Sequence, residues 1–361
     1  MLQRHKWRIS RRPEGHTTAM RRPIFLNILA MPDFRTALSA APAPRQITHT
    51  DPLLLIGSCF SEHIGQKLLE GKFNVLTNPF GIVYNPSSIA ACLSRICAGN
   101  QAFVDADLFE NAGLWHSWQH HGRFSHPDME QALQGINTAY FAAAEQLRKT
   151  NFLLLTFGTS EVFSLRETGK VVANNHKMPA NLFDLRRLSV AEIVEATLEA
   201  LQLIRLVNPN IQLVLTVSPV RHLRSGLIEN QRSKAALILA CEEICRQSPA
   251  AQYFPAYELL LDDLRDYRFY AKDMVHPSDV AVDYVWQFFS DTFFAEKTRS
   301  LHARIERIQA AARHRPFHPD TAAHQAFVRA QLAAITGLKQ EYPQLDFSAE
   351  VAVLQQGARV A

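Results

Sequence analysis

Short apolar segments alternate with long amphipathic ones along most of this chain, and this alternation restricts the fold more than any other feature. Apolar residues of the amphipathic stretches recur at three- and four-residue steps, as in helices that bury one face, and a capping box at Ser189–Glu192 begins one of them. Strands that alternate with helices pair in parallel and are covered on both faces. The pattern predicts an α/β fold with a three-layer, flavodoxin-like parallel sheet. Its five strands are expected at Leu53–Ile56, Asn74–Leu76, Phe152–Phe157, Ile211–Val217 and Tyr253–Phe254.

Composition and charge exclude several classes of protein. With 361 residues, 47% of them hydrophobic, the chain can bury a large core. The net charge of +4 is uneven: residues 1–30 carry seven Arg and Lys against Glu14, which leaves −2 for the rest and argues against a nucleic-acid partner. No stretch approaches the roughly 18 apolar residues of a membrane helix, so no membrane partner is expected. Five cysteines do not make a disulfide framework, and a reducing, cytoplasmic location is expected.

The chain divides into three parts by pattern. Residues 1–30 form a basic leader, and Met31 is the expected true start; an N-terminal export signal, built on the apolar run after Arg21 and Arg22, is the alternative. Residues 31–294 hold the sheet pattern, with an insertion or hairpin at 101–126. Residues 295–361 are expected to be an appended helical segment.

Polar residues follow every predicted strand. Ligands of open parallel sheets bind beyond the carboxyl ends of the strands, so these segments are expected to converge on one edge. They are Ser58 and Cys59, Asn78–Gly81, Gly158–Glu161, Ser218–His222 and Asp273–Ser278.

Nucleophilic catalysis needs a nucleophile, a base, a carboxylate that orients the base, and donors for the oxyanion. Asp273 and His276 are three residues apart, so one turn could hold the carboxylate against one imidazole nitrogen while the other faces Ser58 or Cys59. Backbone N–H groups near residues 58–60, at Gly81 and at Gly158 are the expected oxyanion donors. The simpler interpretation is a turn with a helix cap at Ser58 and a structural Asp273.

Seven separated segments resemble the GSCFA family, which is similar to the SGNH/GDSL hydrolases. The resemblance implies an SGNH-type fold and an esterase or O-acyltransferase that forms an acyl-enzyme on a small-molecule or carbohydrate ester, without metal or cofactor. The alternative is a non-catalytic carbohydrate or small-molecule binding module on the same fold. The segments are LIGSCFSEHIG, NPFGIVYNP, WHSWQHHGRFSHP, TFGTSEVF, NNHKMPANLF, SPVRHLRSGLIENQRSK and DYRFYAKDMVHPS.

The hydrolase blocks transfer to this chain with two departures. Asp273 and His276 match the last block and Gly81 the second. In the third block Ser160 stands where the hydrolases have an asparagine, so the donor is expected to be a hydroxyl, a backbone N–H, or the amide of Asn78 or Asn174. In the first block the register favours Cys59 as nucleophile, whereas the family's chemistry favours Ser58, and both stay open.

Histidines and aromatic residues supply the remaining candidates. A metal site among the histidines of 116–126 is disfavoured because no acidic residue is close by, and Trp115 and Trp118 are expected to form the rim of the site. Substrate contacts are expected from His176, Lys177, Arg221 and His222, for which structural salt bridges are the alternative.

Overall fold

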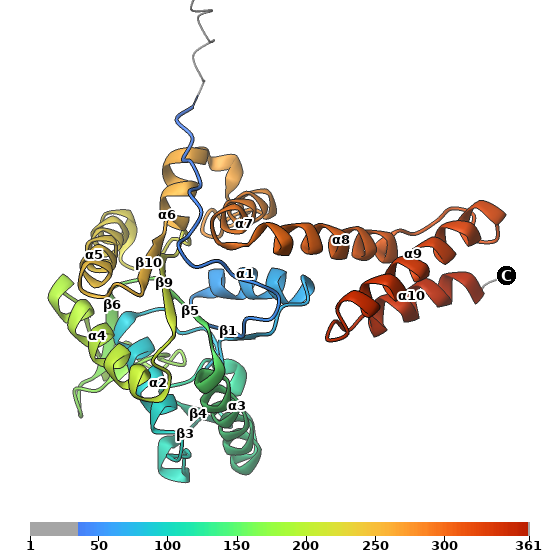
Figure 1. Ribbon diagram of the computed structural model, residues 1–361. Coiled ribbons are helices and arrows are strands. Elements are labelled where there is room, and N and C mark those ends of the chain that lie inside the picture. The colour runs from blue at the N-terminus through green and yellow to red at the C-terminus, as the bar shows by residue number, and fades with distance from the viewer. Residues whose placement is uncertain (1–34, 360–361) are drawn as a thin grey trace, which may run out of the picture. The chain divides into compact units, whose positions relative to one another are not determined.

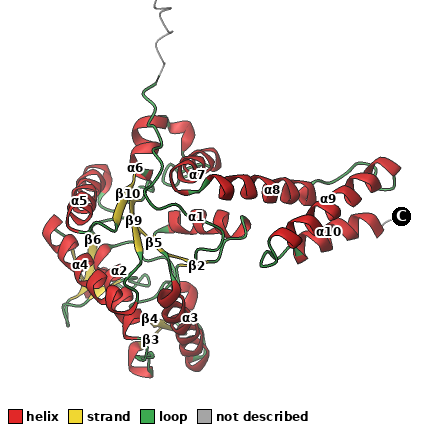
Figure 2. Ribbon diagram, viewed as in Figure 1, coloured by secondary structure: helices red, strands yellow, loops and turns green. Residues whose placement is uncertain are grey.

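The computed structural model describes residues 35–359, so the predicted leader lies outside the described residues. A parallel sheet forms its centre, with the strand order β10-β9-β5-β1-β2 (Figures 1 and 2). This is the flavodoxin-like order, and it confirms the predicted fold class. The five strands are β1 (Leu53–Gly57), β2 (Val75–Thr77), β5 (Phe152–Phe157), β9 (Gln212–Val217) and β10 (Ala251–Phe254).

Helices cover both faces of this sheet because its strands are apolar on both sides. Leu54 and Ile56 of β1 belong to one core with four helices, whereas Leu53 and Leu55 point to the opposite core. The first core contains α2 (Pro86–Ala98), α3 (Met129–Lys149), α4 (Val190–Val207) and α5 (Gly226–Gln247). The second contains α1 (Cys59–Glu70) and α7 (Asp279–Phe293).

The connections place a topological switch point between β1 and β5. From β1 the chain crosses to β2 on one side, and the later strands β5, β9 and β10 add on the other side. Loops at such a switch point diverge and leave room for a ligand. Gly57 lets the two strands lie close there, because a Cβ at this position would approach the carbonyl oxygen of Thr156 to 2.4 Å.

Two smaller sheets extend the central one. The expected hairpin consists of β3 (Leu108–Asn111) and β4 (Leu114–Ser117). An antiparallel sheet with the order β7-β6-β8 was not predicted, because its short strands are half-exposed and one is rich in charge. Its strands are β6 (Glu161–Leu165), β7 (Val171–Val172) and β8 (Phe183–Arg187). The short helical turns are η1 (Asp105–Asp107), η2 (Gly122–Phe124), η3 (Ala180–Leu182), α6 (Ala256–Glu258), the π-helical η4 (Leu259–Leu264) and η5 (Tyr267–Phe269).

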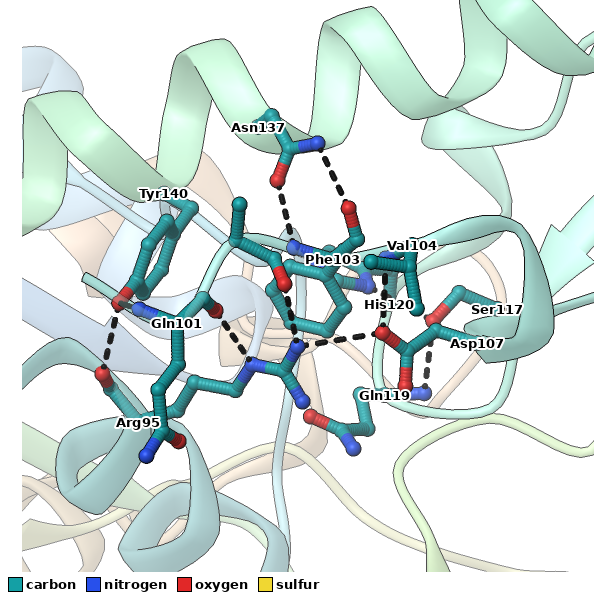
Figure 3. Close-up of polar contacts among 11 residues, drawn as sticks. Arg95, Gln101, Phe103, Val104, Asp107, Ser117, Gln119, His120, Asn137 and Tyr140 are labelled. Atoms are coloured by element: carbon teal, nitrogen blue, oxygen red, sulfur yellow. Dashed lines mark hydrogen bonds and ion pairs between the residues drawn. The ribbon is translucent and has the colours of Figure 1, made fainter. Parts of the chain in front are cut away.

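Arg95 of α2 fastens the hairpin segment to the body (Figure 3). Its guanidinium lies 3.7 Å from the ring centroid of Phe103, donates to the carbonyl of Gln101 at 3.2 Å and pairs with Asp107 at 3.1 Å. Asn137 of α3 holds both backbone groups of Phe103, at 2.8 and 3.0 Å. These contacts anchor the start of the hairpin segment to α2 and α3.

His120 is a buried member of this anchor. Its ring stacks on Phe80 at 4.8 Å and its Nδ1 lies 2.9 Å from the hydroxyl of Ser117. Burial is the main cause that lowers the pKa of His120 to about 3. Since the unfolded value is 6.5, the folded state prefers the neutral ring.

We therefore expect acid to destabilise the protein through His120. The contribution of His120 to the free energy of unfolding is intact above pH 6.5 and is lost as the pH falls toward 3. The loss between pH 6.5 and about pH 5 amounts to about 2 kcal/mol. In urea titrations, His120→Gln should show a correspondingly flatter pH dependence, whereas the exposed His318→Gln should follow the wild type. Equal slopes for all three proteins would contradict this role.

Three helices follow the sheet, as predicted for the C-terminal segment. They are α8 (Glu296–Arg313), α9 (Ala322–Glu341) and α10 (Ser348–Arg359), and they bury their own apolar cluster. Lys72, just after α1, pairs with Glu350 of α10 at 2.7 Å, and Gln309 of α8 donates to the carbonyl of Glu70. Within the described part of the chain, no helix is both long and apolar enough to cross a membrane.

Candidate active site

Asp273 and His276 form the expected contact. The Nδ1 of His276 lies 2.7 Å from one carboxylate oxygen of Asp273, and the other oxygen accepts the N–H groups of Val275 and His276 at 2.9 and 3.0 Å. These hydrogen bonds, that of the imidazole first, lower the pKa of Asp273 to about 2. Because the carboxylate can only accept, Nδ1 carries the hydrogen and Nε2 of the neutral ring is left as a base.

Arg221 supports the loop that carries this pair. Its N–H donates to the carbonyl of Val275 at 3.1 Å, and its guanidinium donates to the carbonyl of Met274 at 3.3 Å. The guanidinium also lies 3.8 Å from the ring centroid of Tyr270. The predicted substrate contact is therefore occupied in holding the loop after β9 against the loop of His276.

The first turn of α1 separates the two candidate nucleophiles. Ser58 is the N-cap: it is 1% exposed, and its hydroxyl accepts the N–H of Phe60 at 3.2 Å. Cys59 is the first helical residue and lies half-buried on a cavity of about 590 Å³. Burial raises the pKa of its thiol. Cys59 is thus the accessible group, and it needs a base to form a thiolate. The cavity is lined by Cys59, Glu62, His63, Gly65, Gln66, Leu69, Val75, Thr77 and Arg123.

The charge of His276 affects one histidine on α1 and one in the loop after β9. Burial lowers the pKa of His63 on α1, and the charge of His276 lowers it further. The pKa of His222, after β9, falls to about 3 through burial, Lys234 and then His276. Lys67 of α1 pairs with Asp283 of α7 at 2.5 Å, so the helix that follows His276 is tied to the helix of Cys59.

Two expected oxyanion donors are occupied. The N–H of Gly81 donates to the carbonyl of Asn78 at 2.8 Å, and the N–H of Gly158 donates to the carbonyl of Tyr84 at 2.7 Å. Neither amide is free to receive developing charge. The hydroxyl of Ser160 is buried against Ser233 at 3.1 Å, so the third-block position does not supply the donor either.

Asn78 has the free amide instead. Its side-chain oxygen accepts the N–H of Gly57 at 2.8 Å, which fixes the amide at the end of β1, and its Nδ2 is buried without a partner among the described residues. Asn174, the other candidate, uses its side-chain oxygen to cap the N–H of His176 at 2.9 Å. Of these predicted donors, Asn78 is the one whose side-chain N–H groups are buried and have no partner in the described part of the chain.

The signature of the GSCFA family matches residues 52–289, and that of the GSCFA domain protein, C-terminal domain, matches residues 305–360. The chain belongs to the GSCFA family. No curated relative matches its sequence. A carbohydrate esterase family 3 from Talaromyces cellulolyticus is similar at 8% identity and a TM-score of 0.32, over 72% of this chain and 99% of that one. The acetyl xylan esterase Est2A from Butyrivibrio proteoclasticus is similar at 11% identity and 0.35, over 67% and 63%.

In this GSCFA protein, His116 and Trp118 of the hairpin segment pack against Phe109 and His176. His176 contacts the carbonyl of Ser117 through Nε2 at 2.8 Å and lies 4.6 Å from the ring of His116, whereas Trp118 stacks on Phe109 at 3.8 Å. Among the described residues, no three metal-ligating side chains come together. The expected rim of Trp118 and the substrate contact of His176 are thus parts of a packed aromatic cluster.

Lys234 of α5 is the residue of this region that sequence reasoning missed. It is 1% exposed, and its Nζ donates to the carbonyls of Gly158 at 2.5 Å and Ser218 at 2.7 Å. The sequence signal for Lys234 is its helical spacing from Asn230, Ser233 and Leu237, which lie on the same buried face of α5. A lysine at such a position indicates a buried charge.

Proposed function

We propose that this GSCFA protein catalyses ester hydrolysis or O-acyl transfer through an acyl-enzyme on Cys59. The Asp273–His276 pair carries this proposal, because a carboxylate that fixes one imidazole nitrogen prepares the other as a general base. Its loop is joined by hydrogen bonds to the carboxyl edge of the sheet on which Cys59 lies. The accessibility of the two candidates favours Cys59 over Ser58 as the nucleophile.

In the first half-reaction, Nε2 of His276 takes the proton of the Cys59 thiol, and the sulfur attacks the carbonyl carbon of the ester. Asp273 stabilises the resulting imidazolium. The amide of Asn78 donates a hydrogen bond to the oxyanion, since its Nδ2 is otherwise unpaired. The intermediate collapses when the C–O bond breaks and His276 returns the proton to the leaving alcohol, which leaves a thioester on Cys59.

In the second half-reaction, His276 deprotonates a water or an acceptor hydroxyl, which attacks the thioester. The C–S bond breaks, and the Cys59 thiol recovers its proton from His276. The cavity beside Cys59 supports a hydroxyl-rich substrate such as an acylated carbohydrate, because donors and acceptors from Gln66, Thr77 and the Arg123–Glu62 pair line it. That pair lies at 3.0 Å and leaves lone pairs and N–H groups for further hydrogen bonds.

The proposal is tested by trapping the intermediate. Purified protein is mixed with p-nitrophenyl acetate, quenched in acid and digested, and the peptide that contains Cys59 should carry one acetyl group. A burst of nitrophenolate equal to the enzyme concentration should accompany it. If turnover does not exceed that of denatured protein and no peptide is acetylated, the chain is a binding module rather than an enzyme.

A further inference from the structure

The amine of Lys234 is buried at the carboxyl edge of the sheet, and it has no negatively charged partner among the described residues. Lys234 is 1% exposed, and among residues 35–359 no carboxylate comes within ion-pair distance of its Nζ. Its two hydrogen-bond partners are the backbone carbonyls of Gly158 and Ser218. Buried charges normally have a partner of opposite charge, because desolvation is costly. Burial accordingly lowers the pKa of Lys234 to about 7, and a negative charge nearby would stabilise its protonated form.

The positions of the Gly158 and Ser218 carbonyls show where such a negative charge would lie. Gly158 follows β5, which pairs with β1 in a register that places Gly57 beside Thr156. Cys59 is two residues beyond Gly57 and Gly158 is two residues beyond Thr156, so both residues follow the carboxyl ends of neighbouring strands. An ammonium group has three hydrogens, and the two carbonyls accept two of them. One N–H remains for an anion.

We propose that Lys234 is the counter-charge that stabilises the thiolate of Cys59. This inference rests on the proposed function, since it takes Cys59 as the reacting group. The two groups also influence each other's proton affinity: Lys234 lowers the pKa of Cys59 against the effect of burial, and Cys59 raises the pKa of Lys234, which burial lowers to about 7. Lys234 acts on the reacting sulfur and has no bond to make or break.

Other charged and titratable groups face this pair. Glu62 on α1 raises the pKa of Cys59. The charge of Lys234 lowers the pKa of His222, in the loop after β9. The ring of Tyr257 on α6 lies 5.8 Å from Nζ of Lys234. Tyr257 donates its hydroxyl to Gln231, and burial raises its pKa. Lys234 is thus the cation of this set that is positioned to respond to the thiolate.

The test measures the reactivity of Cys59 in the absence of any ester, so its outcome is independent of turnover. Iodoacetamide alkylation is followed from about pH 5 to about pH 10 by mass spectrometry of the Cys59 peptide. Lys234→Met should raise the apparent pKa of Cys59 by about one unit and slow its alkylation about three- to tenfold at neutral pH. Ser233→Ala, which removes hydrogen bonds to the Gly158 loop without changing charge, should leave the apparent pKa unchanged.

An unchanged pKa in folded Lys234→Met, or equal shifts in Lys234→Met and Ser233→Ala, would overturn the proposal. A second measurement covers the case in which Lys234→Met does not fold. Cys59→Asp places a fixed carboxylate at the sulfur position, and Cys59→Asn is its neutral match. With Lys234 present, the Asp variant should melt several degrees higher at about pH 6, and the difference should shrink by about pH 10 as Lys234 loses its proton. An Asp variant that melts no higher at either pH would refute the inference.

Discussion

Replacing His276 by alanine should lower the turnover of a short-chain aryl ester about a thousandfold or more. The Asp273 carboxylate fixes the imidazole as a base, and without the imidazole the thiol of Cys59, whose pKa burial raises, remains protonated at neutral pH. General bases of this kind contribute about 10² to 10⁴ in rate, and they act as a unit with the nucleophile. The measurement is the initial rate of p-nitrophenyl acetate hydrolysis.

The fold should survive this substitution, because the His276 side chain is 42% exposed and its loop is also held by Arg221. Circular dichroism and the melting temperature should match the wild type within a few degrees. His318→Ala, which removes an exposed imidazole from the segment between α8 and α9, is the matched control and should keep full activity. A His276→Ala protein that retains turnover within about threefold would remove the hydrolase proposal.

Alanine at Cys59 should abolish acyl-enzyme formation, whereas alanine at Ser58 should not. Cys59 lines the cavity, and no other cysteine or methionine of residues 35–359 does so. Ser58 uses its hydroxyl to cap α1, so its loss should cost about 1 kcal/mol of stability and reduce turnover only a few-fold. Burst amplitude and the acetylated peptide measure the first effect, and urea titration measures the second.

Cys97→Ala is the control for a half-buried thiol outside the site, and it should leave the burst unchanged. The reverse outcome, with activity lost in Ser58→Ala and kept in Cys59→Ala, would show that the hydroxyl is the nucleophile. In that case the cap would have to release its hydrogen bond to Phe60 before reaction.

The strands and the Asp273–His276 contact could be predicted because short-range pattern determines them. The apolar run Phe152–Phe157 is β5 to the residue, and the other central strands differ by at most two residues at an end. Asp273 and His276 are three residues apart, so a single local turn can bring their side chains together. Their catalytic roles remain predictions, as does the division into a leader and two domains.

The oxyanion donors could not be predicted, because a backbone N–H is free or occupied according to distant segments. The amide of Gly158 is taken by Tyr84, more than seventy residues earlier, and Ser160 is taken by Ser233. The choice between Ser58 and Cys59 depends on where α1 begins, and the sequence leaves this start uncertain by one residue. Lys234 was not predicted, because lysine is usually exposed and its burial depends on how α5 packs against the segments after β5 and β9.

The cavity beside Cys59 is walled mainly by residues of α1 and β2, and the sulfur is only a small part of its lining. We therefore expect a protein with alanine in place of Cys59 to keep this cavity. Such an inert protein is a suitable bait: intact ester can be soaked or retained on it, and the natural acyl donor can be recovered uncleaved and identified.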